Sequence, residues 1–240
     1  MDDVYKLLAM APSYIENISV DLILGLPGVT FDEWQSYLRE VVTWPIHHVS
    51  IYFLTIHEDT PLYFKVQKNK VTLPSDENMV NMYYWTREYL MDHGFLQYEL
   101  SNFAKAGFHS RHNSVYWDRK PYKAFGLGAC SFDGSNRIQN EKNLTKYINA
   151  VESGNDPALL VETLTQQQVY LEKIMLNLRL SRGVLWTDLE MGLLEEQKSK
   201  LKHSVEVLKE KNFLVDNGTS IRLTVEGLVV ENQIIGQLLF

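Results

Sequence analysis

A strand–helix–strand pattern in the first 54 residues most restricts the folds that this chain can adopt. Residues 17–24 are short, rich in β-branched side chains, and stop at a Gly-Leu-Pro-Gly turn. Thr30 and Glu33 then have the spacing of a capping box for a helix, and a second apolar strand occupies residues 48–54. Two strands joined by one such helix form a right-handed parallel βαβ unit. The pattern therefore predicts an α/β fold.

A further helix and a long irregular region follow the second strand. Residues 57–74 are rich in turn formers, and residues 77–93 then carry apolar side chains at helical spacing up to a candidate C-cap at Gly94. From residue 95 to about residue 137 the chain is dense in Gly, Asn, Ser and aromatic residues and poor in periodicity. Long ordered loops of this kind are usually functional, so we expect binding residues here.

The composition changes near residues 154–157, where a second domain is predicted. Thr165 and Gln168 form another capping box, a charged helix spans residues 195–211, and Asp216-Asn217-Gly218 separates two short apolar strands as a hairpin turn. Helices followed by a small hairpin are typical of a winged-helix-like module. We predict a barrel and aromatic loop region over residues 1–155 and a C-terminal winged-helix-like domain over residues 156–240.

The composition excludes several classes of protein. With 240 residues and 45% hydrophobic side chains the chain can bury a sizeable core, which excludes intrinsic disorder. A net charge of -7 argues against a nucleic-acid partner. The single cysteine, Cys130, excludes an internal disulfide and also a [4Fe–4S] cluster held by this chain alone, since such clusters need three or four thiolates.

The ends and apolar stretches of the chain predict its compartment. The sequence begins with acidic residues where a targeting peptide would be basic, and its apolar stretches are interrupted well short of a membrane span. We expect a cytoplasmic protein with no stable membrane insertion.

Asp21 is the first candidate binding residue, because it lies within an apolar strand. Its neighbours on both faces are apolar, so we expect both faces to be covered and the carboxylate to need a partner. That partner is either a neighbouring loop or a ligand at the carboxyl ends of the strands. The residues alone leave these two interpretations open.

The second candidate is the cluster from Arg111 to Trp117 in the irregular region. His112 has the chemistry to ligate a metal or a heme iron, and Tyr116 and Trp117 that to wall a pocket for a flat macrocycle. The alternative is an aromatic anchor that packs a loop, with His112 and Asn113 bonded to the backbone. From the residues alone that structural role is favoured, and the other histidines are interpreted as surface or capping residues.

Several motifs together resemble the oxygen-independent coproporphyrinogen III oxidase family of radical SAM proteins. Residues 21–28 (DLILGLPG) resemble the family's DLIxGLPG, and HNSVYW at residues 112–117 is the motif of its heme-chaperone branch. Three further segments agree in the same order, namely residues 52–62 (YFLTIHEDTPL), 98–104 (YELSNFA) and 222–228 (RLTVEGL). The resemblance extends from about residue 15 to the end of the chain.

The resemblance implies a fold and a set of binding residues. The family folds as a partial (β/α) barrel that holds a [4Fe–4S] cluster and S-adenosylmethionine (SAM), followed by a small helical, winged domain. Asp21 matches a strand carboxylate at a SAM site, and Thr55 lies where a later strand approaches that site. The heme candidates that match the chaperone motif are His112, Asn113, Tyr116 and Trp117.

Two departures limit what the resemblance predicts. The family's CxxxCxxC motif and its first barrel strands are absent, and Phe132 stands where relatives carry a histidine. We therefore expect the C-terminal portion of a heme chaperone that binds heme and transfers it to an acceptor protein, with no catalytic residue assigned and no cluster ligands of its own. The alternatives are a porphyrinogen oxidase in the intact protein, or a non-catalytic binding remnant. A first strand left at a sheet edge also predicts self-association.

Overall fold

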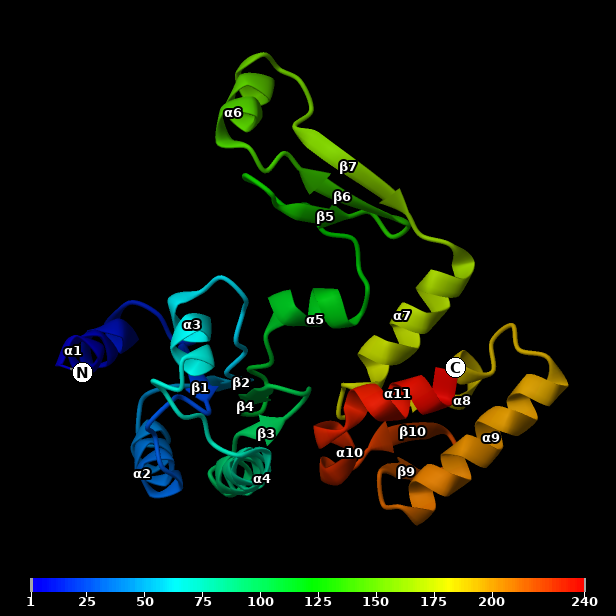
Figure 1. The fold of residues 1–240 in the computed structure, drawn as a ribbon, viewed down its shortest axis with the longest axis horizontal. Helices are drawn as coiled ribbons and strands as arrows, with labels where there is room; N and C mark the ends of the chain where they lie inside the picture. Colours follow the sequence, from blue (N-terminus) through cyan, green and yellow to red (C-terminus); the bar gives the residue numbers. More distant parts are fainter. Residues whose placement is uncertain (1, 240) are drawn as a thin grey trace. The chain divides into compact units, whose positions relative to one another are not determined.

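The computed structural model describes residues 2–239, and the chain divides into two compact units between Ser110 and Arg111. Unit 1, up to Ser110, is a mixed sheet with helices, and unit 2, from Arg111, contains two further small sheets and most of the helices (Figure 1). Each unit has its own buried apolar residues. We describe them separately.

Unit 1 contains a four-stranded sheet in the order β1-β2-β4-β3. Strands β1 and β2 are parallel and are joined through α2, while β4 runs antiparallel to both β2 and β3, so the predicted parallel βαβ unit is confirmed. The Thr30–Glu33 capping box also forms at the start of α2. The elements of this unit are α1 (Asp2–Met10), the 3₁₀ turn η1 (Ala11–Ser13), β1 (Ser19–Leu24), α2 (Phe31–Val41), β2 (His48–Phe53), α3 (Pro61–Gln67), α4 (Asp76–Asp92), β3 (Leu96–Gln97) and β4 (Asn102–Ala104).

Helices α2 and α4 cover one face of this sheet, and that face is apolar. Leu24, Ile51 and Phe103 are fully buried, and the ring of Phe53 contacts Tyr83 of α4 at a centroid distance of 5.3 Å. The two helices are tied to each other by the indole of Trp34, which donates a hydrogen bond of 2.7 Å to the hydroxyl of Thr86. Burial of this face supplies the main driving force for folding of unit 1.

The expectation that β1 is covered on both faces is wrong. Its residues alternate, with Ser19, Asp21 and Ile23 exposed, and within residues 2–239 β1 lies at the edge of the sheet. Asp21 is exposed, so this carboxylate is solvated. Apolar residues on both faces of the strand do not show that both faces are buried: Val20 and Leu22 are partly buried, whereas Ile23, on the same face as Asp21, is exposed.

Unit 2 begins with α5 and ends in a helical module with a small sheet. Helices α7, α9 and α11 enclose an apolar core with the antiparallel sheet β8-β10-β9, which confirms the predicted hairpin around Asn217. The capping box at Thr165 is also present. The elements are α5 (Arg111–Trp117), β5 (Cys130–Phe132), β6 (Asn136–Asn140), α6 (Leu144–Glu152), β7 (Ala158–Thr163), α7 (Gln166–Leu178), β8 (Val184–Leu185), α8 (Trp186–Leu189), α9 (Glu195–Glu210), β9 (Leu214–Asp216), β10 (Ser220–Leu223), α10 (Val225–Val229) and α11 (Glu231–Leu239).

The regions predicted to be irregular contain regular elements. Helix α3 lies within residues 57–74, and β3, β4, α5 and β5 lie within residues 95–137. The antiparallel sheet β5-β6-β7 was not predicted, since β5 and β6 are short and partly polar and the pairing of β6 with β7 spans the intervening helix α6. The predicted boundary at residues 155/156 precedes β7, whereas the compact units divide at residue 110; a domain division at 155/156 stays a prediction.

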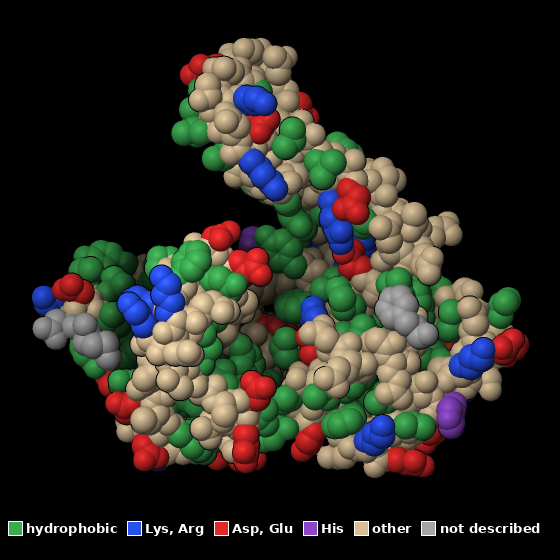
Figure 2. Space-filling view, viewed as in Figure 1, with side chains coloured by type: hydrophobic (Ala, Val, Ile, Leu, Met, Phe, Trp, Pro, Cys, Tyr) green, Lys and Arg blue, Asp and Glu red, His purple; other side chains and the backbone are tan. Residues whose placement is uncertain are grey.

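The surface of unit 2 carries exposed apolar side chains on α6 and β7. Leu144 and Ile148 of α6 and residues 159–161 of β7 are exposed, and apolar side chains are visible over this part of the molecule in Figure 2. On the face drawn there, Lys and Arg side chains lie singly or beside acidic residues. No helix within residues 2–239 is long and apolar enough to cross a membrane.

Candidate functional site

His112 and Tyr116 lie on one face of the short helix α5, because residues four apart in a helix are neighbours. The imidazole Nε2 of His112 is 3.1 Å from the phenol oxygen of Tyr116, and the two rings meet edge to face with centroids 5.0 Å apart. Both side chains are exposed. The expectation of a loop at this motif is wrong: the segment is helical, and it contains neither Gly nor Pro.

A row of aromatic rings continues from Tyr116 into the β5 hairpin. Tyr122 contacts Tyr116 at a centroid distance of 4.6 Å and Phe132 at 6.2 Å. The backbones of Tyr122 and Phe132 also exchange two hydrogen bonds, of 2.7 and 2.9 Å, so the row has a fixed base. Partial burial raises the pKa of the Tyr122 phenol, which therefore stays protonated at neutral pH.

The other two residues of the motif lie on an adjoining face of α5. Asn113 and Trp117 are also four residues apart, and both are half-buried. The structure thus places all four heme candidates on one helix, with His112 and Tyr116 facing solvent and Asn113 and Trp117 partly covered.

In unit 1, Asp21 heads a row of polar side chains across three strands. Asp21 pairs with Ser50 of β2, and Ser50 pairs with Asn102 of β4, so all three lie on the face opposite α2 and α4, where Asp21 is exposed and Ser50 and Asn102 are buried. Thr55 follows the end of β2, is exposed, and its hydroxyl lies 3.5 Å from the carbonyl of Phe53. The structure therefore does not bring Thr55 to the level of Asp21 in the sheet.

Behind Asn102 lies a buried carboxylate that sequence reasoning did not select. Glu99 is 2% exposed and accepts hydrogen bonds from the backbone N–H of Ser101 and from the amide Nδ2 of Asn102. Burial raises the pKa of Glu99, because it penalises the charged form. The YELSNFA motif contains both residues, so a signal was available, but it did not indicate burial.

His48 is also part of this polar face, and its interpretation as a surface residue is wrong. It is buried, with Nδ1 2.8 Å from the hydroxyl of Ser19 and Nε2 2.8 Å from that of Tyr98. Burial lowers the pKa of His48, partly offset by the nearby Asp21 carboxylate. The histidine thus favours its neutral form and connects β1, β2 and Tyr98, the residue after β3.

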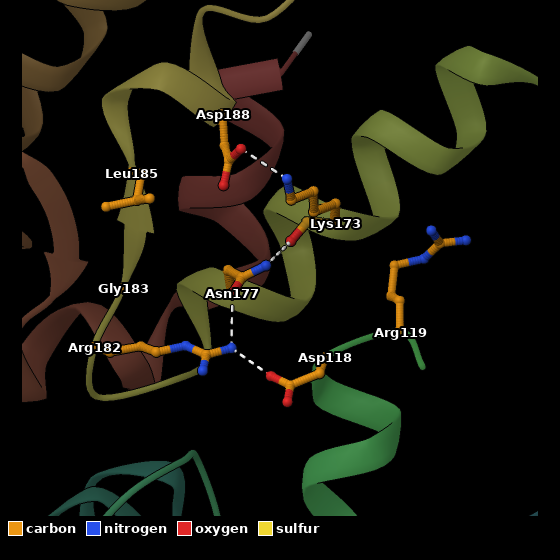
Figure 3. A pocket seen from close by; sticks show the side chains of 8 residues that line it. All are labelled: Asp118, Arg119, Lys173, Asn177, Arg182, Gly183, Leu185 and Asp188. Carbon is orange, nitrogen blue, oxygen red and sulfur yellow. Dashed lines mark hydrogen bonds and ion pairs between the residues drawn. The ribbon is translucent and has the colours of Figure 1, made fainter. Parts of the chain in front are cut away.

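A pocket of about 610 Å³ lies between the segment after α5 and the helix α7 (Figure 3). Two ion pairs line it. Arg182 and Asp118 point toward each other at 2.6 Å, and Lys173 meets Asp188 at 2.7 Å. Arg119 is the residue after Asp118. Its side chain points away from the Arg182–Asp118 pair and forms an ion pair with Glu172.

Known proteins similar to this chain agree with the resemblance that its motifs carry. A family model described as the HemN C-terminal domain matches residues 164–230. The heme chaperone HemW of Bacillus subtilis is 30% identical over 93% of this chain and 59% of its own length, and HemW of Synechocystis is 31% identical over 87% of this chain and 51% of its own length. Over most of its length this chain is similar to proteins of the HemW/HemN-like radical SAM family.

A solved structure has a similar fold. The coproporphyrinogen III oxidase HemN of Escherichia coli, a radical SAM enzyme, is similar with a TM-score of 0.77 at 18% identity, over 99% of this chain and 58% of that one. The α/β fold expected from the sequence is thereby confirmed. The chain spans between half and three fifths of the length of these HemW and HemN proteins.

The residues of this chain do not fit a four-iron cluster. Its sequence contains one cysteine, Cys130, which lies exposed on β5, and within residues 2–239 no three His, Cys, Asp or Glu side chains are grouped so as to hold a metal ion. Four-iron clusters are held by three or four thiolates. No chemical step through such a cluster is derived for this chain.

Proposed function

We propose that this chain binds heme on α5, as the heme-binding part of a heme chaperone. The observation that carries the proposal is the exposed His112 imidazole, whose Nε2 lies 3.1 Å from the Tyr116 hydroxyl. A histidine that ligates a metal usually donates its other ring N–H to a neighbouring oxygen, which fixes the tautomer. In this arrangement Nε2–H donates to Tyr116, and Nδ1 is the ligand of the heme iron.

The aromatic row supports the same proposal. Tyr116 and Tyr122 contact each other beside the exposed helix, and the buried ring of Phe132 supports Tyr122 from the β5 hairpin. Aromatic side chains line most sites for flat apolar ligands, where they contribute a large buried area. Asn113 and Trp117 support the helix from its half-buried face.

The relatives named heme chaperones make heme the first ligand to test, and an acceptor protein its destination. For the SAM side of the family, this chain contributes the exposed Asp21 of β1 and the exposed Thr55 after β2. We assign neither residue a catalytic role. The expectation of porphyrinogen oxidation rests only on a shared fold with HemN, so it is not proposed for this chain.

A heme titration of the full chain tests the proposal. The wild type should shift the Soret band of added heme to that of a histidine-ligated species, and His112→Ala should lose this shift. The matched control is His203→Ala, which removes another exposed histidine of unit 2, on α9, and should leave the spectrum unchanged. Identical spectra for wild type and His112→Ala would overturn the proposal.

Tyr116→Phe tests the finer assignment of the ring nitrogens. Removing the hydroxyl takes away the acceptor for Nε2–H, so the histidine becomes a weaker and less oriented ligand. We expect heme to bind with about tenfold lower affinity and with the same histidine-type Soret band. An unchanged affinity would show that Tyr116 does not orient His112.

A further inference from the structure

Helix α5 is too short to hold its shape alone. It has seven residues, and isolated helices of that length are unstable in water. The free-energy cost of nucleating such a helix exceeds the stabilisation that one or two turns supply. The position of His112 must therefore be fixed by contacts that α5 and its neighbours make with the rest of unit 2. The two residues that follow α5, Asp118 and Arg119, make the charged contacts at this point.

These two adjacent residues have opposite charges, and each pairs with a residue of the other sign. The Asp118 carboxylate lies 2.6 Å from Arg182 Nη2, and Arg119 Nε lies 2.6 Å from a carboxylate oxygen of Glu172. Both partners lie within residues 164–230, which match the HemN C-terminal domain, whereas α5 lies outside that range. The contacts therefore join the helix that carries His112 to that domain.

These two ion pairs also fix the position along the chain at which α5 meets the C-terminal domain. A shift of the chain by one residue would bring Arg119 towards Arg182, two cations, and would take the carboxylate of Asp118 from its partner. Arg119 and Glu172 are 12% and 17% exposed, so an unpaired charge there is poorly solvated. Only one alignment pairs both charges, and that alignment sets where α5 ends.

The backbone conformation of Arg119 is unusual for an arginine. Its φ is +49°, and its N–H and that of Lys120 close the end of α5 onto the carbonyls of Tyr116 and Val115. Glycine or asparagine usually occupies this left-handed position after a helix. An arginine is retained here with its guanidinium paired to Glu172 and lying 5.0 Å from the Phe132 ring, at the base of the aromatic row.

We propose that Asp118 and Arg119 are positioning residues, which clamp α5 onto the HemN C-terminal domain through Arg182 and Glu172 and so hold His112 in place for its ligand. The inference deepens the proposed heme-binding function and rests on it for the identity of that ligand. It also gives the C-terminal domain a role: it is the support of the binding helix.

The experiment reverses and then restores one ion pair. Arg182→Asp sets two carboxylates against each other, and Asp118→Arg together with Arg182→Asp restores attraction with the charges exchanged. The matched control is Arg222→Asp, another exposed arginine of the same domain, on β10. Arg119→Gly is the fourth variant, since glycine keeps the left-handed backbone and removes the guanidinium with its contacts to Glu172 and the Phe132 ring.

The first readout needs no heme. Hydrogen exchange of the α5 amides should quicken about tenfold or more in Arg182→Asp and Arg119→Gly, move back toward wild type in the exchanged double variant, and stay unchanged in the control. Exchange rates in Arg182→Asp and Arg119→Gly equal to wild type would overturn the inference, whether or not the chain binds heme.

The second readout separates positioning from general stability. In a heme titration, Arg182→Asp and Arg119→Gly should bind heme about tenfold more weakly, and their complexes should show a weaker histidine-type Soret band. In an unfolding experiment, the midpoint of the α7–α11 module in these variants should equal that of the control. If wild type shows no histidine-dependent Soret band, the proposed function fails, and the exchange data alone decide the clamp. Normal heme affinity in both variants would show that the clamp does not position His112.

Discussion

Asn102 donates a hydrogen bond from its amide Nδ2 to Glu99, while the oxygen of the same amide, Oδ1, is buried without a partner among residues 2–239. Glu99 is 2% exposed and Asn102 is 4% exposed, so water does not replace the missing bond at either group. A buried acceptor without a donor costs about 1–3 kcal/mol. This pair is therefore the least satisfied part of the polar sheet face.

The first prediction concerns Glu99→Gln. The new amide can accept from the N–H of Ser101 and donate to Asn102 Oδ1, once the Asn102 amide turns over; Nδ2 then takes the position without a partner, and the buried negative charge is removed. We expect the free energy of unfolding at pH 7 to stay equal or rise by about 1 kcal/mol, whereas Glu99→Ala should lower it by about 2 kcal/mol. Urea denaturation of the three proteins measures this.

The pH dependence of the same variant gives a second check. Burial raises the pKa of Glu99, so its contribution to stability is full below about 4.5 and is lost as pH rises through the raised pKa. Glu99→Gln removes that loss, and its advantage over wild type should be larger at pH 7 than at pH 4.5. A variant clearly less stable than wild type at pH 7 would contradict the predicted turn of Asn102.

The second prediction concerns acid sensitivity at His48. Burial lowers its pKa from the usual 6.5, so the unfolded chain takes up a proton before the folded one does. The contribution is present above pH 6.5 and is lost as pH falls through the lowered pKa. As the pH is lowered below 6.5, the urea concentration at the unfolding midpoint should decrease for wild type and decrease less for His48→Gln. The control is His57→Gln, at an exposed histidine, which should behave as wild type does.

The third prediction concerns Gly183, which precedes β8. A Cβ at this position would lie 2.0 Å from the carbonyl oxygen of Ile221, and φ is +72°. Gly183→Ala should therefore lower stability by about 3 kcal/mol or more, through backbone overlap. Gly154→Ala is the control, since φ there is +70° but the space is open, and it should cost only about 1 kcal/mol. Equal losses in thermal unfolding would show that the close approach is relieved.

The fourth prediction concerns iron. Because the sequence has one cysteine, reconstitution with iron and sulfide should leave far fewer than four irons per chain. Iron content in Cys130→Ser should equal that of wild type, since one exposed thiol does not hold a cluster. An intact four-iron absorption spectrum on the purified chain would contradict this prediction.

The fifth prediction concerns the free edge of β1. A strand edge exposes unpaired backbone groups, and Ile23 adds an exposed apolar side chain to it. Light scattering should show a mass that rises with concentration, and Ile23→Lys should reduce it. Ile148→Lys, at an exposed apolar residue of α6, should not. A wild type that remains monomeric at every concentration would refute association through this edge.

Local features of the fold were predictable from the sequence. The capping boxes at Thr30 and Thr165, the parallel βαβ unit and the hairpin at Asn217 all depend on side chains within a few residues of one another. The family motifs were equally local. The helical state of His112 was not predicted, because a helix of seven residues is too short to show a helical periodicity.

The sequence by itself determined the local elements, the family and the shortage of sulfur ligands, because caps, periodicities, motifs and residue counts need no tertiary contact. Only the tertiary structure decided that Asp21 is solvated, that it shares a row with Ser50 and Asn102, and that Asp118 meets Arg182, 64 residues away. Which face of a strand is covered, and which charges pair, depend on how distant segments pack, and residue spacing along the chain does not specify that.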